Sequence, residues 1–96
     1  MGANTFGNLG QGKSAQEAFK TLVEEDRQEN GHSPYSGTIG CKRDFKVITV
    51  PSGKDPLTFA HELIDADDPR IADKHGPAGC VKMAEDRWYF FGWAAS

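Results

Sequence analysis

Arg-Trp-Tyr-Phe-Phe-Gly-Trp, residues 87–93, decides the fold, because five of its seven residues are aromatic. A strand with one face in water alternates apolar and polar residues, whereas this stretch is apolar on both sides. It therefore predicts a strand at the centre of a sheet, or one whose second face is covered by a partner. Glu85-Asp86 ahead of it predicts a hairpin turn, and Cys80–Met83 predicts the preceding strand.

A first helix is expected from about Ala15 to Asn30. Ser14 and Glu17 have the spacing of a capping box, in which a hydroxyl and a carboxylate satisfy the first backbone N–H groups. Apolar residues then recur every three or four positions, which is typical of a helix with one buried face. Gly31 can adopt the left-handed conformation that ends a helix.

The remaining patterns complete the order β-α-β-β-α-β-β. A second helix begins after Asp55 with Pro56 at its first position, and Asp67-Asp68-Pro69 closes it. Further strands are expected over residues 3–9, 38–42 and 45–50, the last two joined tightly at 43–44. We predict one α+β domain over residues 1–96, with a mainly antiparallel sheet of four to five strands and both helices on one face.

Size and charge restrict the function. A chain of 96 residues has room for one core, and homodimerisation is one way to bury more surface. The net charge of −3 argues against sequence-independent binding of nucleic acid or an anionic membrane. No apolar run approaches the roughly 18 residues of a membrane span. Cys41 and Cys80, without a secretory signal ahead of them, predict free thiols in the cytoplasm.

The charge is unevenly distributed along the chain. Residues 1–31 carry −2, residues 32–54 carry +3, and residues 55–86 carry −5. Carboxylates gather at the ends of the two expected helices. They are Glu24, Glu25, Asp26 and Glu29 in the first group, and Asp65, Asp67, Asp68 and Asp73 in the second. A solvated surface explains both groups. The more specific interpretation is an acidic patch that binds a basic, nucleic-acid-binding surface on another protein. The anchors of that interface would be Tyr35, Trp88, Tyr89 and Trp93. A small anion site near Lys42, Arg43 and Lys46 is a second option.

Four patterns suggest other chemistry. Gly7–Ser14 fits the phosphate-loop pattern G-x-x-x-x-G-K-[ST], although a glycine turn before a capped helix explains the same residues. His32, Cys41, His75 and Cys80 could supply zinc ligands, and Cys41 or Ser36 with His32 or His75 could pair a nucleophile with a base. His61-Glu62 lacks the second histidine of a zinc-protease motif and is better explained by an exposed helix face. We therefore predict no catalytic residue, metal or cofactor.

Several segments carry a resemblance. They are Gly31-His32, Tyr35–Lys42, Asp68–Ile71, Lys74–Gly79 and Phe90–Trp93. Together they resemble a group of small, largely uncharacterised phage-encoded proteins, in which an acidic residue stands near the position of Cys41. The resemblance supplies no activity and no catalytic residue. It implies a protein of the host cytosol that binds and blocks a host enzyme, as inhibitors of defence nucleases do.

The expected function is thus an anti-CRISPR-like inhibitor that binds a host nucleic-acid-handling or defence complex. Its contacts would lie on the acidic helix ends and on an exposed recognition loop, residues 31–42. The residues expected to contact the partner are Glu24, Glu25, Asp26, Glu29, His32, Tyr35, Lys42, Asp65, Asp67 and Asp68. The alternative is a small-ligand or nucleotide-binding module, with or without enzymatic activity, that uses the glycine loop 7–14.

Overall fold

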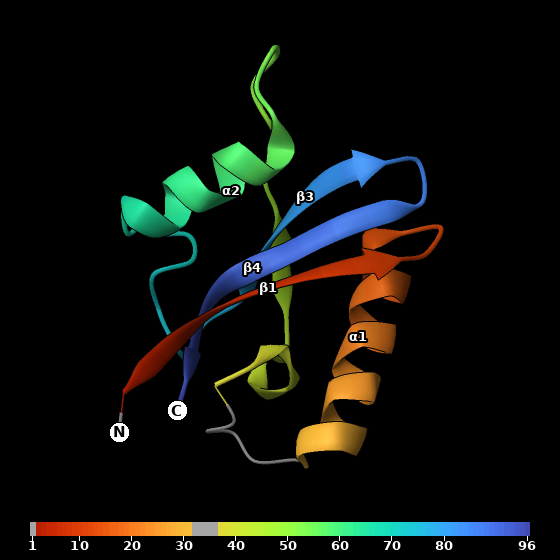
Figure 1. Cartoon of the computed structure of the whole chain (residues 1–96), viewed down its shortest axis with the longest axis vertical. Coiled ribbons are helices and arrows are strands. Elements are labelled where there is room, and N and C mark those ends of the chain that lie inside the picture. The colour runs from red at the N-terminus through yellow and green to blue at the C-terminus, as the bar shows by residue number, and fades with distance from the viewer. Residues whose placement is uncertain (1, 32–36) are drawn as a thin grey trace.

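The computed structural model describes residues 2–31 and 37–96, which form an α+β fold (Figure 1). The elements in chain order are β1 (Ala3–Gln11), α1 (Ala15–Asn30), a 3₁₀ turn η1 (Ile39–Cys41), β2 (Phe45–Val47), α2 (Pro56–Asp65), β3 (Ala78–Ala84) and β4 (Arg87–Ala95). No helix of the described residues is long and apolar enough to cross a membrane.

The strand β4 lies inside the sheet, whose order is β1-β4-β3-β2. It pairs antiparallel with β1 on one side and with β3 on the other, so the prediction of a central strand is confirmed. The strand β2 pairs parallel with β3 at the opposite edge from β1. The sheet is therefore mainly antiparallel, as predicted.

The helix boundaries follow from the local sequence. The Ser14 hydroxyl accepts a hydrogen bond from the Glu17 backbone N–H at 3.2 Å, and the Asp55 carboxylate accepts one from Thr58 at 3.0 Å. Gly31 ends α1 with φ 80° and ψ −174°. The predicted stop at Gly31 is confirmed, but its backbone is not left-handed helical, because its ψ is extended.

The two helices cover opposite faces of the sheet, so the prediction that both pack on one face is wrong. Neighbouring residues of a strand point to opposite faces. On β4, Phe90 belongs to the core cluster with Phe19 of α1, whereas Phe91 belongs to the cluster with Leu63 of α2. Figure 1 shows α1 and α2 on either side of the strands. A strand that is apolar on both sides needs a cover on each.

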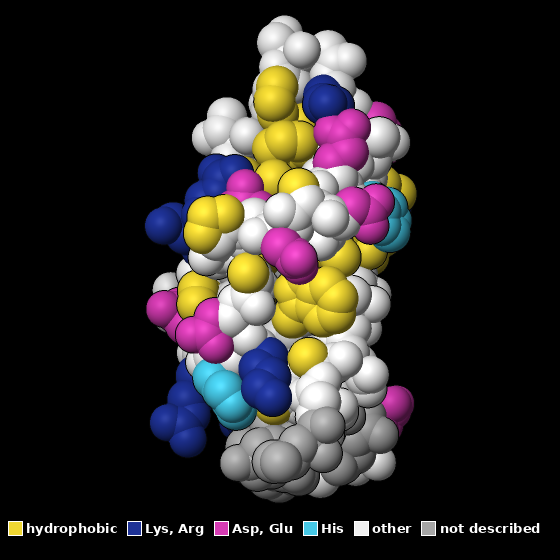
Figure 2. Space-filling model, turned by 90° about the vertical axis from the view of Figure 1, so that its left-hand side faces the viewer, with side chains coloured by type: hydrophobic (Ala, Val, Ile, Leu, Met, Phe, Trp, Pro, Cys, Tyr) yellow, Lys and Arg dark blue, Asp and Glu magenta, His cyan; other side chains and the backbone are white. Residues whose placement is uncertain are grey.

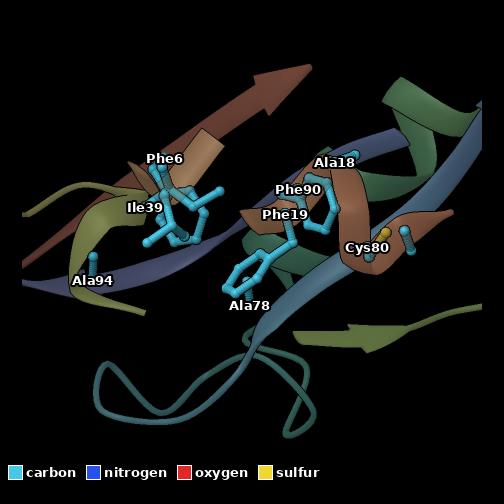
Figure 3. Close-up of a cluster of buried hydrophobic side chains, with 10 residues drawn as sticks. Phe6, Ala18, Phe19, Ile39, Ala78, Cys80, Phe90 and Ala94 are labelled. Carbon is cyan, nitrogen blue, oxygen red and sulfur yellow. The ribbon is translucent and has the colours of Figure 1, made fainter. Parts of the chain in front are cut away.

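The core on the α1 side is dense (Figure 3). Phe19, Phe45 and Phe90 pack together with ring centroids 5.0–5.5 Å apart. Ile39 of η1 and Phe6 of β1 extend this cluster toward the chain ends. The 16-residue helix α1 and the turn η1 therefore both cover this face of the sheet.

The strand predicted at Thr38–Lys42 is instead a 3₁₀ turn, so the sheet has four strands in the described residues. Asp26 of α1 explains the difference, because its carboxylate accepts hydrogen bonds from the Thr38 hydroxyl at 2.5 Å and the Gly40 N–H at 2.7 Å. Arg27 donates from Nε to the Gly40 carbonyl at 3.0 Å. These bonds satisfy backbone groups that a strand would direct to a neighbour.

Candidate functional site: a cleft between α2 and the β1–β4 edge

A cleft of about 580 Å³ opens between α2 and the outer strands. Its lining comes from β1 (Thr5, Phe6 and Gly7), from α2 and its end (His61, Ile64, Asp65 and Asp67) and from β4 (Tyr89 and Trp93). Figure 2 looks onto the side where α2 ends and β1 begins, and it shows hydrophobic side chains at the surface with acidic ones beside them. The cleft has the size and mixed lining of a ligand pocket.

The floor of the cleft is aromatic because a glycine makes room for it. A Cβ atom at Gly7 of β1 would collide with the Tyr89 hydroxyl, so the tyrosine ring extends toward β1 only because Gly7 lacks a side chain. Tyr89 also stacks on Phe91, with ring centroids 5.9 Å apart. Partial burial raises the pKa of the Tyr89 hydroxyl.

Asp67 forms one wall of the cleft in a conformation that favours glycine. Its φ is 50°, and it is the only non-glycine residue with positive φ among the described residues. The Asp67 N–H bonds to the Ile64 carbonyl at 3.1 Å and the Asp68 N–H to the Leu63 carbonyl at 3.0 Å. This pair of bonds is the Schellman motif, whose left-handed position is usually glycine. An aspartate there tolerates the conformation at some cost in stability.

Trp93 also lowers the stability of the fold at this cleft. Its indole Nε1 is buried and has no hydrogen-bond partner among the described residues. An unsatisfied buried donor destabilises a fold by about 1–3 kcal/mol. By contrast, the indole N–H of Trp88 donates to the Gly12 carbonyl at 3.2 Å.

Carboxylates give the cleft its charge. Neither Asp65 nor Asp67 forms an ion pair with any described residue, and both are exposed. Asp68 is different, because Arg70 donates to its two carboxylate oxygens at 2.9 and 3.0 Å. These bonds lower the pKa of Asp68 to about 2. The cleft is thus suited to a cationic group, which two carboxylates would attract and two aromatic faces would contact.

The predicted acidic residues do not form one surface. Glu24, Glu25 and Glu29 are exposed on α1, on the other side of the sheet from Asp65 and Asp67. Asp26, half-buried, is committed to η1 as described above. His32 and Tyr35 lie outside the described residues. The structure therefore brings Asp65 and Asp67 together with Tyr89 and Trp93, and separates them from the acidic group on α1.

Lys42, expected at the surface, is buried with 2% of its area exposed. Its ammonium donates to the backbone carbonyls of Asp73, Lys74 and Gly76 at 3.4, 3.2 and 2.9 Å. Burial lowers the pKa of this amine. The expectation of a surface contact or anion ligand at Lys42 is not met in this arrangement, because the ammonium is enclosed by these carbonyls.

The phosphate-loop pattern has a structural explanation. Residues 7–11 are part of β1 and extended, so they cannot wrap a phosphate with their N–H groups. At Gly10 a Cβ atom would lie 2.8 Å from Leu22, so this glycine allows α1 to approach the strand. The Ser14 hydroxyl caps α1. The capped helix of the simpler interpretation is confirmed, but the turn ahead of it is confined to residues 12–14, because β1 extends to Gln11.

Within the described residues, the structure does not bring together all of the cysteines and histidines that were considered as zinc ligands or as a nucleophile with its base. Cys80 is fully buried in the α1-side core, and burial raises the pKa of its thiol to about 12. Cys41 and His75 do line one small pocket, of about 260 Å³, with Arg43 and Lys74. No group of three or more metal-ligating side chains occurs within residues 2–31 and 37–96. His61 was expected only as part of an exposed helix face, but it lines the α2 cleft. The sequence places His61 one helical turn before Asp65. That spacing does not show which strands lie opposite the two side chains.

Comparison of the chain with protein-family models, with curated proteins and with solved structures gave no match.

Proposed function

We propose that this chain is a non-enzymatic binding protein whose α2 cleft takes a Lys or Arg side chain from a basic partner protein. The observation that carries the proposal is the coincidence of two stability costs at one cleft. Asp67 with its left-handed backbone lies there, and so does the indole N–H of Trp93, which has no hydrogen-bond partner among residues 2–31 and 37–96. Such costs gather at functional sites, because selection for binding outweighs the loss of stability.

The chemistry of the lining selects the ligand. A guanidinium or ammonium group gains from a carboxylate and from the face of an aromatic ring. Asp65 and Asp67 provide carboxylates that form no ion pair with a described residue, and Tyr89 and Trp93 provide the rings. The acidic charge of the surrounding segment would also steer a basic surface toward the cleft.

A titration with a short arginine-rich peptide tests this site. We expect the indole N–H resonance of Trp93 to shift, while that of Trp88, which is bonded to Gly12, stays in place. The double variant Asp65→Asn/Asp67→Asn should weaken binding by roughly tenfold or more, because each carboxylate contributes a charge-assisted contact.

The matched control carries the same charge change on the other face. Glu24→Gln/Glu25→Gln should leave the affinity within about twofold, apart from the general effect of net charge. Equal losses in both double variants would show that the peptide responds to overall charge and would overturn the assignment of the cleft. A glutamine peptide of equal length should not bind.

We further propose, from the resemblance to small phage proteins and from the acidic cleft, that the partner is a host nucleic-acid-handling or defence complex. A protein that covers a basic, nucleic-acid-binding surface should compete with nucleic acid for it. In a bacterial lysate, the wild-type chain should retain a partner that added duplex DNA or 0.5 M salt displaces. If the Asp65→Asn/Asp67→Asn variant retains the same partner equally well, the cleft is not the inhibitory surface.

A further inference from the structure

The small pocket lined by Cys41, Arg43, Lys74 and His75 has the opposite character to the α2 cleft. An arginine, a lysine and an imidazole side chain surround a thiol, and none of the described residues that line the pocket carries a carboxylate. The carboxylates next to Arg43 and Lys74 in the sequence accept hydrogen bonds from backbone N–H groups in turns. Asp44 accepts a hydrogen bond from the Phe45 N–H at 2.7 Å, and Asp73 accepts one from the His75 N–H at 2.9 Å.

One wall of the pocket is fixed by α1. Asp26 and Arg27 hold η1 through the Gly40 backbone, as described above, and η1 carries Cys41. The Cys41 thiol donates to the Thr38 carbonyl at 3.0 Å, which orients the sulfur within the turn. At Gly40 a Cβ atom would collide with the Asp26 carboxylate, so only glycine permits this attachment.

The other wall is fixed by the buried Lys42. Its ammonium binds three carbonyls of the segment 73–76, the same segment that presents Lys74 and His75 to the pocket. A further bond from the Gly76 N–H to the Asp73 carbonyl, at 2.9 Å, tightens this turn. Lys42 is therefore a positioning residue for the pocket. Both walls are held before any ligand arrives, which lowers the entropic cost of binding.

From this geometry we infer that the pocket binds a small oxyanion of the phosphate class, held by Arg43, Lys74 and His75. Arg43 can offer two parallel N–H donors to two oxygens. Lys74 donates to the Gly2 carbonyl at 3.3 Å and has further ammonium protons for a ligand. This site is independent of the proposed function, because it shares no residue with the α2 cleft.

The Cys41 thiol provides a direct assay. The neutral reagent iodoacetamide should alkylate Cys41, and inorganic phosphate should slow the reaction. At a phosphate concentration ten times the Kd, simple occupancy predicts roughly tenfold protection. Cys80 is 0% exposed and should not react in the folded protein, so a single rate is observed. Sodium chloride at the same ionic strength should give no comparable protection.

The variant Arg43→Gln/Lys74→Gln should weaken phosphate binding by roughly tenfold or more, whereas Lys46→Gln on the exposed edge strand β2 should change it by less than about twofold. A second measurement does not depend on the thiol: phosphate should shift the backbone amide resonances of residues 41–43 and 74–76 in the wild type. Ribose 5-phosphate and ribose distinguish a phosphate monoester from free phosphate as the ligand. Protection that persists in the double variant, or the absence of both protection and shifts, would overturn the inference.

Discussion

On the face of the sheet covered by α1, a 16-residue helix and the turn η1 bury Phe90 of β4 and leave Trp88 partly buried. On the other face, α2 has 10 residues and leaves Leu9 of β1 53% exposed. Phe90 on the first face and Phe91 on the second are both fully buried, but Tyr89 and Trp93 on the second face are only partly buried. The same central strand therefore supports packed phenylalanine rings on the α1 side, which we call the closed face, and the α2 cleft on the other side, which we call the open face.

The two faces also differ in how well their polar groups are satisfied. On the closed face, polar groups such as Asp26 are fully engaged in holding the fold. On the open face, Asp67 adopts an unfavourable backbone conformation and the Trp93 N–H lacks a partner among the described residues. Substitutions on the two faces should therefore change the free energy of unfolding by different amounts, and at Asp67 with the opposite sign.

The largest expected effect is on the closed face. Phe90→Ala should lower the free energy of unfolding by about 3–5 kcal/mol, because it leaves a cavity among packed rings. Trp93→Ala should cost much less, about 1–2 kcal/mol, since the side chain is partly exposed and its loss removes an unsatisfied donor. Urea denaturation of both variants measures the difference. Equal losses would mean that the α2 face is as tightly packed as the α1 face.

The next effect concerns the attachment of η1. Asp26→Ala should destabilise the protein by about 2 kcal/mol, because the Thr38 hydroxyl and Gly40 N–H lose a charged acceptor. Glu25→Ala, the adjacent exposed carboxylate, should change stability by less than about 0.5 kcal/mol. Thermal unfolding of the two variants measures this difference in stability. Equal stabilities would show that Asp26 is a solvated residue that does not hold η1.

At the cleft we expect a substitution that raises the free energy of unfolding, by a smaller amount. Asp67→Gly should stabilise the fold by about 0.5–1 kcal/mol, because glycine adopts positive φ freely and a negative charge is removed from the helix C-terminus. The same variant should weaken binding of the arginine-rich peptide. Asp67→Asn keeps a residue that tolerates this backbone but removes the charge, so it separates the two contributions. A destabilised Asp67→Gly protein would contradict the proposed cost.

The smallest effect depends on pH. The folded pKa of Asp68 is about 2, below its ordinary value of 3.8, because Arg70 donates to the carboxylate. As pH falls through 4 toward 2, the unfolded chain binds a proton at this position before the folded chain does. The stability contributed by this pair is therefore present above pH 4 and declines below it. Asp68→Asn should reduce the slope of stability against pH in this range, and an unchanged slope would exclude a contribution from the pair.

Sequence patterns predicted the elements that depend on neighbouring residues. Helix α1 begins and ends where Ser14, Glu17 and Gly31 indicate, and β4 is central, as its aromatic residues on both sides require. The strand expected at residues 38–42 was wrong, because its bonds to Asp26 and Arg27 come from 12–14 positions away. Local propensity gives no information about such partners.

The candidate site was only partly predictable. Asp65 and Asp67 were identified as partner-binding residues from their charge, and Tyr89 and Trp93 as anchors from their type. What joined them was the packing of α2 on the face of β4 that carries Tyr89 and Trp93. The pairing of β1 with β4 then placed Gly7 beside the Tyr89 ring. Lys42 was expected at the surface because lysines usually are. Its burial depends on three carbonyls more than 30 residues further along the chain.

By itself, the sequence determined the α+β class, the helix caps and the central aromatic strand, because capping and periodicity act over a few residues. Only the tertiary structure decided which face each helix covers, since the alternation of a strand is equally compatible with either arrangement. That choice gave Phe90 a complete cover and left Tyr89 and Trp93 beside two carboxylates. It also brought Cys41 together with Lys74 and His75, because pockets form between segments that are distant in the chain.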